Sequence, residues 1–395
     1  MKYIGIIILL VLCLTLLLFT SYRINTVKAE TASGNLENTV IVDTGESVTV
    51  YPQQWATGDG TVENPWANDC IQKAYDFVPD GGTIFLKAGY YTLSDTISTA
   101  KKINIIGEGR NKSIIVLDIA HGSGIRIVTD YCTLKGFTID GDSQTDGEQY
   151  LSPIGIGYCD YALVEDIEVK NAGYYGINIY EVNHSSFQNI YAHDNYRHGL
   201  HPGSDTAGRN KYNTYRDIYA WNNGMDGFSD RGSTVNYTTE FHNVWDNIQC
   251  WDNGRYGIDI DSQKGGVLSN SITSGNLSSG IYLSLVEDIS VNNCLSTLNG
   301  ITNENPGIWL KTAKNVNLVN VIVKNNYSGI EIRDCSKIAL TACQSYDDRV
   351  TLIQRYGIDI KEGCSGITVL NCKLTPNKYG EIYNPIGVVI TEKRE

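Results

Sequence analysis

A glycine followed by an aliphatic residue or phenylalanine recurs at regular spacing from Gly155 to Ile358. Nine such pairs follow one another at intervals of 21 to 30 residues. The pairs are Gly155-Ile156, Gly176-Ile177, Gly199-Leu200, Gly227-Phe228, Gly257-Ile258, Gly280-Ile281, Gly307-Ile308, Gly329-Ile330 and Gly357-Ile358. Each interval is too short for a domain and holds two or three alternating apolar and polar runs, not a helical period. Such a repeat predicts a solenoid, in which stacked coils bury their apolar faces against one another.

Asparagine accompanies the glycine in the central repeats. It stands four residues before the glycine in six successive units, at Asn195, Asn223, Asn253, Asn276, Asn303 and Asn325. In stacked coils these amides would hydrogen-bond along a ladder. The leucine-rich-repeat spacing is absent, so the sequence predicts an all-β fold, a parallel β-helix. Cysteine pairs 29 residues apart, Cys335 with Cys364 and Cys343 with Cys372, indicate equivalent positions in neighbouring coils.

The segment before the repeats has the order of a cap. A short amphipathic helix is expected after Asn68 or Asp69, followed by Gly81-Gly82 and by strands at 83–86, 90–93 and 103–109. This order resembles the N-terminal cap of pectin-lyase-like right-handed parallel β-helices. The resemblance implies a single-stranded right-handed parallel β-helix with a short N-terminal capping helix.

The ends of the chain differ from the repeats. Residues 1–29 contain an apolar run, Ile4 to Phe19, typical of a signal peptide or an N-terminal membrane anchor. We expect a linker at 30–50, the cap and first coils at 51–115, β-helix repeats at 116–376 and a C-terminal tail at 377–395. The protein would then be extracellular or at the cell surface, monomeric, and in contact with a membrane only through its N-terminal segment.

The net charge of −13 argues against a nucleic-acid partner, because phosphate binding requires a basic face. The repeat instead predicts a surface for a linear polysaccharide. The second and fourth residues after each glycine point outward, and stacking aligns them in columns about 4.8 Å apart. The outward pairs are Asn178 and Tyr180, His201 and Gly203, Ser229 and Arg231, Asp259 and Asp261, Tyr282 and Ser284, Trp309 and Lys311, Glu331 and Arg333, and Asp359 and Lys361. The residues just before the glycines form a third column, which includes Tyr175, His198, Asp226 and Tyr256.

The middle coils concentrate the chemically versatile side chains. Five of the six histidines lie between His184 and His242. The two longest intervals there carry extra loops, Asp205 to Lys211 and Thr234 to Asn243, which we expect to wall the groove. The candidate catalytic residues are His198, His201, Asp226, Asp230, Arg231, Tyr256, Asp259 and Asp261. The candidate sugar-binding residues are Tyr180, Arg197, Tyr282 and Trp309.

The segment that begins at His198 and includes Phe228 resembles the catalytic stretch of mannuronan C5-epimerases over about 35 residues. Asn222, Asn223, Gly224, Asp226, Gly227 and Phe228 match the second half of the family motif. In the first half, the family's catalytic Tyr, Asp and His fall on His198, His201 and Gly203, so its site is not reproduced intact. A further family Asp falls nearest Asp230. The next coil repeats the Tyr and Asp positions at Tyr256 and Asp259, with Asp261 in place of His.

Three functions follow from these residues. In the first, a uronan epimerase or lyase, His198 or His201 removes the proton at C5 and Tyr256 is the acid. Arg231 neutralises the substrate carboxylate, aided by Arg197 or a bound Ca²⁺; no other metal or cofactor is expected. In the second, an inverting glycoside hydrolase, Asp259 and Asp261 form the carboxyl pair and Asp230 is a third carboxyl. The third is a glycan-binding or cell-surface protein without turnover.

Overall fold

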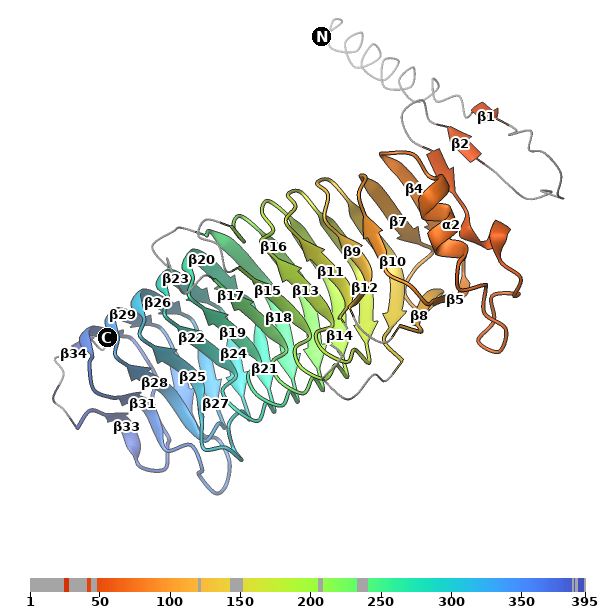
Figure 1. Ribbon diagram of the computed structural model, residues 1–395. Helices are drawn as coiled ribbons and strands as arrows, with labels where there is room; N and C mark the ends of the chain where they lie inside the picture. Colours follow the sequence, from red (N-terminus) through yellow and green to blue (C-terminus); the bar gives the residue numbers. More distant parts are fainter. Residues whose placement is uncertain are drawn as a thin grey trace, which may run out of the picture.

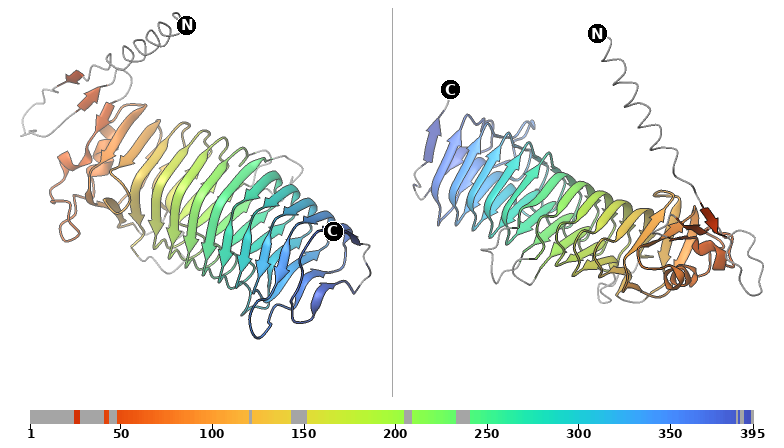
Figure 2. Two further views of the ribbon diagram at one scale, coloured as in Figure 1. Left: turned by 180° about the vertical axis from the view of Figure 1, so that it is seen from behind. Right: turned by 90° about the horizontal axis from the view of Figure 1, so that it is seen from above.

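The computed structural model describes residues 25–27, 41–43, 48–119, 122–142, 152–204, 209–232, 241–385, 387 and 390–393. The chain is a parallel β-solenoid, in which one coil follows another along a single axis (Figures 1 and 2). Twelve strands, one from each coil, pair in parallel and form a continuous sheet, here called the groove sheet. Its strands in order are β6 (Ile97–Thr99), β9 (Ser123–Ile127), β11 (Ser152–Gly157), β13 (Ile177–Tyr180), β15 (Leu200–Gly203), β17 (Phe228–Arg231), β19 (Ile258–Asp261), β22 (Ile281–Ser284), β25 (Pro306–Lys311), β28 (Ser328–Arg333), β31 (Tyr356–Ile360) and β33 (Gly380–Tyr383).

The remaining strands form the other sides of the coils. They are β1 (Asn25–Val27), β2 (Ile41–Asp43), β3 (Val48–Val50), β4 (Gly82–Leu86), β5 (Gly89–Leu93), β7 (Ile103–Gly107), β8 (Ser113–Leu117), β10 (Thr133–Asp140), β12 (Leu163–Lys170), β14 (Ser186–His193), β16 (Thr214–Trp221), β18 (Asn243–Trp251), β20 (Lys264–Ser269), β21 (Ile272–Ser274), β23 (Glu287–Asn292), β24 (Leu295–Thr297), β26 (Lys314–Val319), β27 (Ile322–Lys324), β29 (Ser336–Thr341), β30 (Gln344–Tyr346), β32 (Ser365–Leu370) and β34 (Ile390–Lys393). From β3 onward their pairings are parallel, and only the β1–β2 and β2–β3 pairs are antiparallel.

Asp and Asn residues turn the corners inside the long strands. Asp166, Asn189, Asp217 and Asn247 each have φ between 52° and 54° and interrupt the pairing of β12, β14, β16 and β18 at the same place. Asn and Asp tolerate this left-handed conformation better than other residues with side chains. The corner amides also bond between coils, as Asn189 Nδ2 does to Asp166 Oδ1 at 2.9 Å. Local sequence thus fixes where each coil bends.

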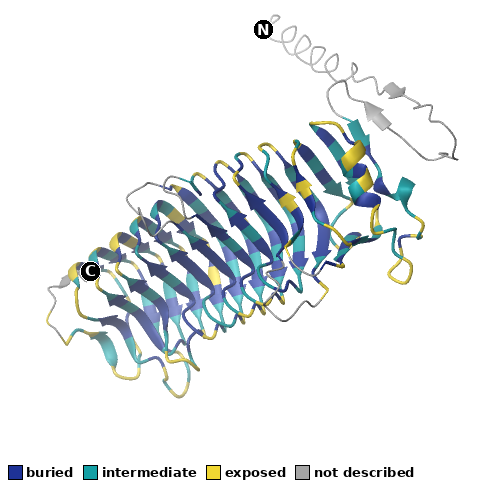
Figure 3. Ribbon diagram, viewed as in Figure 1, coloured by how far each residue is buried: buried dark blue, intermediate teal, exposed yellow. Residues whose placement is uncertain are grey.

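Alternation along the strands builds one continuous core. On β13, Ile177 and Ile179 are fully buried while Asn178 and Tyr180 lie on the outer face, as the repeat predicts. The buried residues run the length of the solenoid (Figure 3).

The asparagine ladder is present, but two of its predicted members were wrong. Side-chain amide bonds of 2.8–3.3 Å link Asn195, Asn223, Asn253, Asn276, Asn299 and Asn326 in successive coils. Asn303 and Asn325 lie outside this buried ladder. The loop before β25 lengthens its coil, so the distance from ladder to glycine changes there. Gln354 and Asn377 continue the ladder at the C-terminal end.

The predicted capping helix is α2 (Cys70–Phe77), which follows a 3₁₀ turn, η1 (Pro52–Trp55). Cys70, Ile71 and Ala74 face the core and close its N-terminal end. Within the described residues, no helix is long and apolar enough to cross a membrane. Apart from residues 25–27, the predicted signal peptide or anchor lies outside the described residues.

Two predicted boundaries were wrong. Part of the expected C-terminal tail is a further coil, because β33 pairs with β31 and β34 pairs with β32. At the other end, β3 lies in the expected linker but pairs in parallel with β4. The cysteine stacking is confirmed, since Ser365 N bonds to Cys335 O and Lys373 N to Cys343 O. The nine cysteines of the described chain are free thiols.

Candidate functional site

The strand register brings the predicted columns together on the groove sheet. Asn178 pairs with His201, Ser229 with Asp259, and Asp259 with Tyr282. The neighbouring column pairs Gly203 with Arg231 and Arg231 with Asp261. Residues 23 to 30 positions apart in sequence therefore lie side by side on one face.

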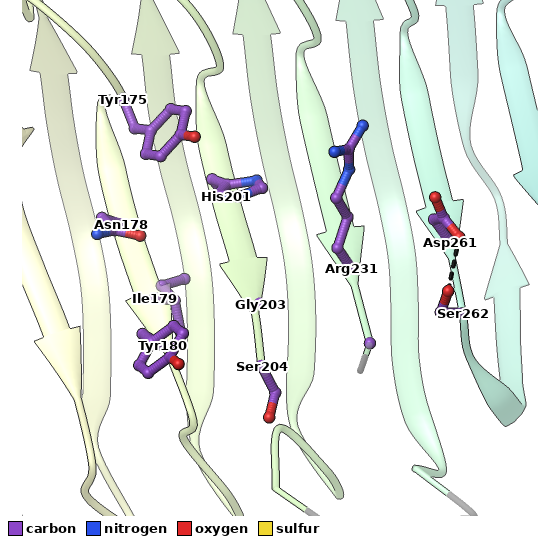
Figure 4. A pocket seen from close by; sticks show the side chains of 11 residues that line it. Tyr175, Asn178, Ile179, Tyr180, His201, Gly203, Ser204, Arg231, Asp261 and Ser262 are labelled. Carbon is purple, nitrogen blue, oxygen red and sulfur yellow. Dashed lines mark hydrogen bonds between the residues drawn. The ribbon is translucent and has the colours of Figure 1, made fainter. Parts of the chain in front are cut away.

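A cavity of about 410 Å³ opens over the middle of this sheet. It is lined by Tyr175, Asn178, Tyr180, His201, Arg231 and Asp261, among others (Figure 4). Four of these, His201, Arg231, Asp261 and Tyr180, are predicted site residues. The cavity exists partly because Gly203 has no side chain between Tyr180 and Arg231 in the outward column.

His201 presents one free ring nitrogen to this cavity. Its Nδ1 lies 3.2 Å from the carbonyl oxygen of Ser229, so Nδ1–H donates there and Nε2 keeps its lone pair. Burial, with the neighbouring His198 and Arg231, lowers the pKa of His201 to about 3. The Tyr175 ring lies 4.3 Å from the His201 ring between centroids. Burial raises the pKa of Tyr175, so its hydroxyl keeps its proton.

His198 lies behind His201 and outside the cavity. The two imidazoles stack with centroids 4.9 Å apart, and the His198 side chain is only 4% exposed. Its Nδ1 is 3.0 Å from Oδ2 of Asp226, which is fully buried and also paired with Arg255. Burial lowers the pKa of His198, whereas the bonds from Arg255 and His198 outweigh burial and lower that of Asp226. Since neither His198 nor Asp226 reaches the groove, both support the wall rather than contact a substrate.

Asp259 shares its carboxylate with two arginines. Its Oδ2 lies 3.3 Å from Nη2 of Arg231 and 3.3 Å from Nη2 of Arg255. The side chain is fully buried, and burial together with Asp226 raises its pKa to about 7. Asp261, two residues on, lines the cavity and accepts a bond from the Ser262 hydroxyl. The predicted carboxyl pair is thus divided between a buried and an accessible member.

Asp230 points into the solenoid, and its assignment to the groove was wrong. The alternation of β17 turns it inward, between Ser229 and Arg231, and it is fully buried. Its carboxyl oxygens accept bonds from Trp245 Nε1 at 2.8 Å, Asn210 Nδ2 at 2.8 Å and Gln263 Nε2 at 2.9 Å. Burial raises its pKa to about 7. Asp230 holds a polar cluster in the core.

The other predicted residues lie around the cavity rather than in it. Tyr256 stacks on Tyr282 at 4.5 Å, and Trp309 lies 5.2 Å beyond Tyr282. Burial raises the pKa of Tyr256. These rings continue the groove sheet past the cavity. Arg197 lies over the ring of Tyr174 and bonds to its hydroxyl.

The histidine cluster has two structural origins. His198 and His201 belong to the groove, but His184 stacks between Tyr161 and Tyr212, and His242 stacks on Tyr212. His193 stacks on Trp221 at 4.2 Å, on another side of the coil. The crowding of histidines in the sequence therefore reflects aromatic ladders as well as a site.

Sequence reasoning missed Tyr175 and Arg255. Tyr175 was visible in the column before the glycines, where it precedes His198. Arg255 follows Arg197 and Met225 in the column one residue earlier, and reading that column would have found it. Of the two loops expected to wall the groove, residues 205–208 and 233–240 lie outside the described residues. No group of three or more His, Cys, Asp or Glu side chains in the described chain could hold a metal ion.

Comparisons with known proteins agree with this architecture. The family model for the "Pel9A-like, right handed beta helix region" matches residues 48–305. The A-module of the Azotobacter vinelandii mannuronan C-5 epimerase AlgE4 superposes with a TM-score of 0.69 at 16% identity, covering 87% of this chain and 99% of that one. The AlgE6 A-module from the same organism gives 0.56 at 18% identity, with 87% and 97% covered. The N-terminal fragment of bacteriophage Phi29 gene product 12 gives 0.52 at 16% identity, with 82% and 66% covered. No curated protein sequence matches the chain significantly.

Proposed function

The chain belongs to the Pel9A-like right-handed β-helix family, and from this premise we propose that it acts on a uronic-acid-containing polysaccharide. The proposed reaction begins with removal of the C5 proton of a uronate unit, the step that lyases and C5-epimerases share. The A-modules of the two mannuronan C-5 epimerases have the same fold, which supports a polysaccharide substrate.

The observation that carries the proposal is the grouping of His201, Tyr175 and Arg231 around one cavity. Proton removal beside a carboxylate needs a base, an acid and a cation. His201 Nε2 is unprotonated because the pKa of this histidine is low and Nδ1 donates to Ser229. Arg231 is 43% exposed in its side chain, so part of its guanidinium is free to meet a carboxylate. A bound carboxylate would also raise the pKa of His201 and make it a stronger base.

The position of the acid favours a lyase. In elimination, His201 takes the C5 proton, the C4–O4 bond breaks, a C4–C5 double bond forms, and the Tyr175 hydroxyl gives its proton to the leaving O4. In a syn elimination, base and acid act on neighbouring atoms from one side of the sugar, and the Tyr175 and His201 rings are 4.3 Å apart on one wall. An epimerase instead needs a proton donor on the opposite face of the sugar. Tyr256, the acid expected from the sequence, does not line this cavity, and Tyr175 replaces it in the proposal.

The two alternatives have weaker support. A hydrolase would need both carboxyl groups at the substrate, but Asp259 is buried against two arginines and only Asp261 lines the cavity. A protein that only binds glycan would not require a base with a free nitrogen. The proposed steps use Arg231 as the cation and do not require Ca²⁺. The N-terminal apolar run supports action outside the cell.

We test the proposal by incubating the purified full-length protein with uronans and neutral glycans. A lyase produces the absorbance of unsaturated uronate, an epimerase exchanges the C5 proton with D₂O without cleavage, and a hydrolase produces reducing ends without absorbance. Binding of a glycan without any of these signals would indicate a glycan-binding protein without turnover.

The decisive variants are His201→Ala and Tyr175→Phe. We expect each to lower kcat by roughly 10²-fold or more, the usual contribution of a positioned acid or base. His193→Gln is the matched control, since it removes an imidazole from the same coils on another side. Full activity of His201→Ala would exclude His201 as the base.

A further inference from the structure

The groove extends beyond the His201 cavity toward the N-terminal end. A second cavity, of about 260 Å³, lies next to it and shares Asn178 and Tyr180 with it. Its other lining residues include Ser123, Arg126, Gly155 and Tyr158. The two cavities therefore form one path along the groove sheet, from β9 to β19.

Two glycines open the floor of the second cavity. Gly155 and Gly157 occupy the two outward positions of β11, where the next coil has Asn178 and Tyr180. A Cβ atom at Gly155 would lie 2.7 Å from Ser123 Oγ, and one at Gly157 would lie 3.2 Å from Tyr180 O. A side chain at either position would fill the space, so β11 keeps a depression one coil wide.

Arg126 places a positive charge at this depression. It is exposed and pairs in register with Gly155, and it has no carboxylate partner within ion-pair distance among the described residues. The cavity lining contains no acidic side chain. In a chain with a net charge of −13, a groove section with a free arginine and no carboxylate selects for an anionic group.

Tyr158 provides an exposed ring beside the same depression. Its side chain is 59% exposed, and its ring meets Tyr180 edge-on with centroids 5.3 Å apart. An exposed tyrosine face is suited to stacking on the apolar face of a sugar ring. Arg126, Tyr158 and Asn178 thus present a cation, a ring and an amide around one open floor.

We propose that this cavity is a separate binding site for a uronate unit of the same linear chain, with Arg126 holding its carboxylate. The inference rests on the proposed function, since it names how the substrate is held away from the reacting bond. Arg126 on β9 and Arg231 on β17 are four coils apart along the axis. At about 4.8 Å per coil, this separation is roughly 19 Å, or about four sugar units. A ligand must therefore contain about five uronate units to contact both arginines.

Calorimetric titration of the full-length protein with oligouronates of two to eight units tests the proposal. We expect the affinity of wild type to rise once the ligand reaches about five units. Arg126→Gln should weaken binding of these longer ligands about tenfold, the scale of one lost charged hydrogen bond, and leave shorter ligands unchanged. Gly157→Leu should have the same effect by filling the floor.

Arg216→Gln is the matched control, because it removes an exposed arginine from β16, outside the groove sheet. The proposal is overturned if Arg216→Gln weakens binding as much as Arg126→Gln, if affinity does not depend on length, or if no oligouronate binds. Turnover is measured in the same samples. Length-dependent binding without turnover supports the second site and rejects the proposed chemistry. Turnover together with binding that Arg126→Gln leaves unchanged at every length rejects the second site alone.

Discussion

At the scale of single residues, burial decides which of the polar side chains can act. His201 and His198 stack on each other, yet only His201 lines the cavity. Asp259 and Asp261 lie on one strand, yet only Asp261 does. The buried residue of each pair has a charged partner: Asp259 pairs with Arg255, and His198 pairs with Asp226, which Arg255 also binds. The cavity wall thus consists of accessible side chains, such as His201 and Asp261, with buried charged side chains behind them.

The low pKa of His201 predicts an unusual pH profile. Burial lowers this pKa to about 3, so the base form is fully present above about pH 4 and is lost only below it. Because kcat/KM reports ionisations of the free enzyme, the ionisation of His201 should not change it from pH 5 to 8, where the group of this site expected to titrate is Asp259, with a pKa of about 7. Measuring kcat/KM across this range in wild type and in Asp259→Asn checks the assignment. A rise centred near pH 6.5 that persists in Asp259→Asn would mean that an ordinary solvent-exposed histidine is the base.

At the scale of elements, the buried amide ladder ties the coils together at one corner. Asn253 accepts bonds from the backbone and side-chain nitrogens of Asn223 and donates to Ala220 O and Asn276 Oδ1, at 2.9–3.1 Å. All of these groups are shielded from water, so an incomplete ladder leaves buried donors and acceptors without partners.

Asn253→Ala should therefore destabilise the protein by about 2–4 kcal/mol, since it breaks several buried hydrogen bonds at once. Asn303→Ala, at an exposed loop position, should change stability by less than about 0.5 kcal/mol. Denaturant unfolding of both variants, followed by circular dichroism, compares them. Equal midpoints for the two variants would show that the ladder adds no stability.

The sequence predicted the groove better than the ladder, for a physical reason. The glycine pair lies at the start of, or inside, each groove strand from β11 to β31, so counting from it gives the register of that strand. The ladder lies on the far side of a corner of variable length. A longer loop before β25 places its member at Asn299, eight residues before Gly307, and a corner one residue shorter before β28 places the next at Asn326. The burial of Asp259 depends on its pairing with Arg231 and Arg255, and that of His198 on its contacts with Tyr175, His201 and Asp226, which no spacing encodes.

At the scale of the whole molecule, the solenoid needs both of its ends covered. At the N-terminal end, α2 packs its apolar face on the core. At the C-terminal end, the last coil places β33 and β34 beside β31 and β32. Parallel coils that end without a cover expose unpaired backbone groups and apolar side chains.

Removal of residues 377–395 should therefore lower the melting temperature and cause self-association. The deletion uncovers the edges of β31 and β32 and takes away Asn377, whose Oδ1 accepts a bond from Gln354. Size-exclusion chromatography and thermal unfolding measure both effects. A deletion variant with the elution volume and melting temperature of the full-length chain would support the interpretation of this segment as a tail.

The uniform stacking of coils also sets fixed distances between side chains along the groove sheet. Arg126, His201 and Arg231 lie on coils of equal spacing, and the strand of each coil is hydrogen-bonded to the next. The two arginines would therefore already have their final separation before a long glycan binds, and the protein would lose little conformational entropy on binding. The same rigid solenoid would then both select glycans by their length and position one bond for reaction.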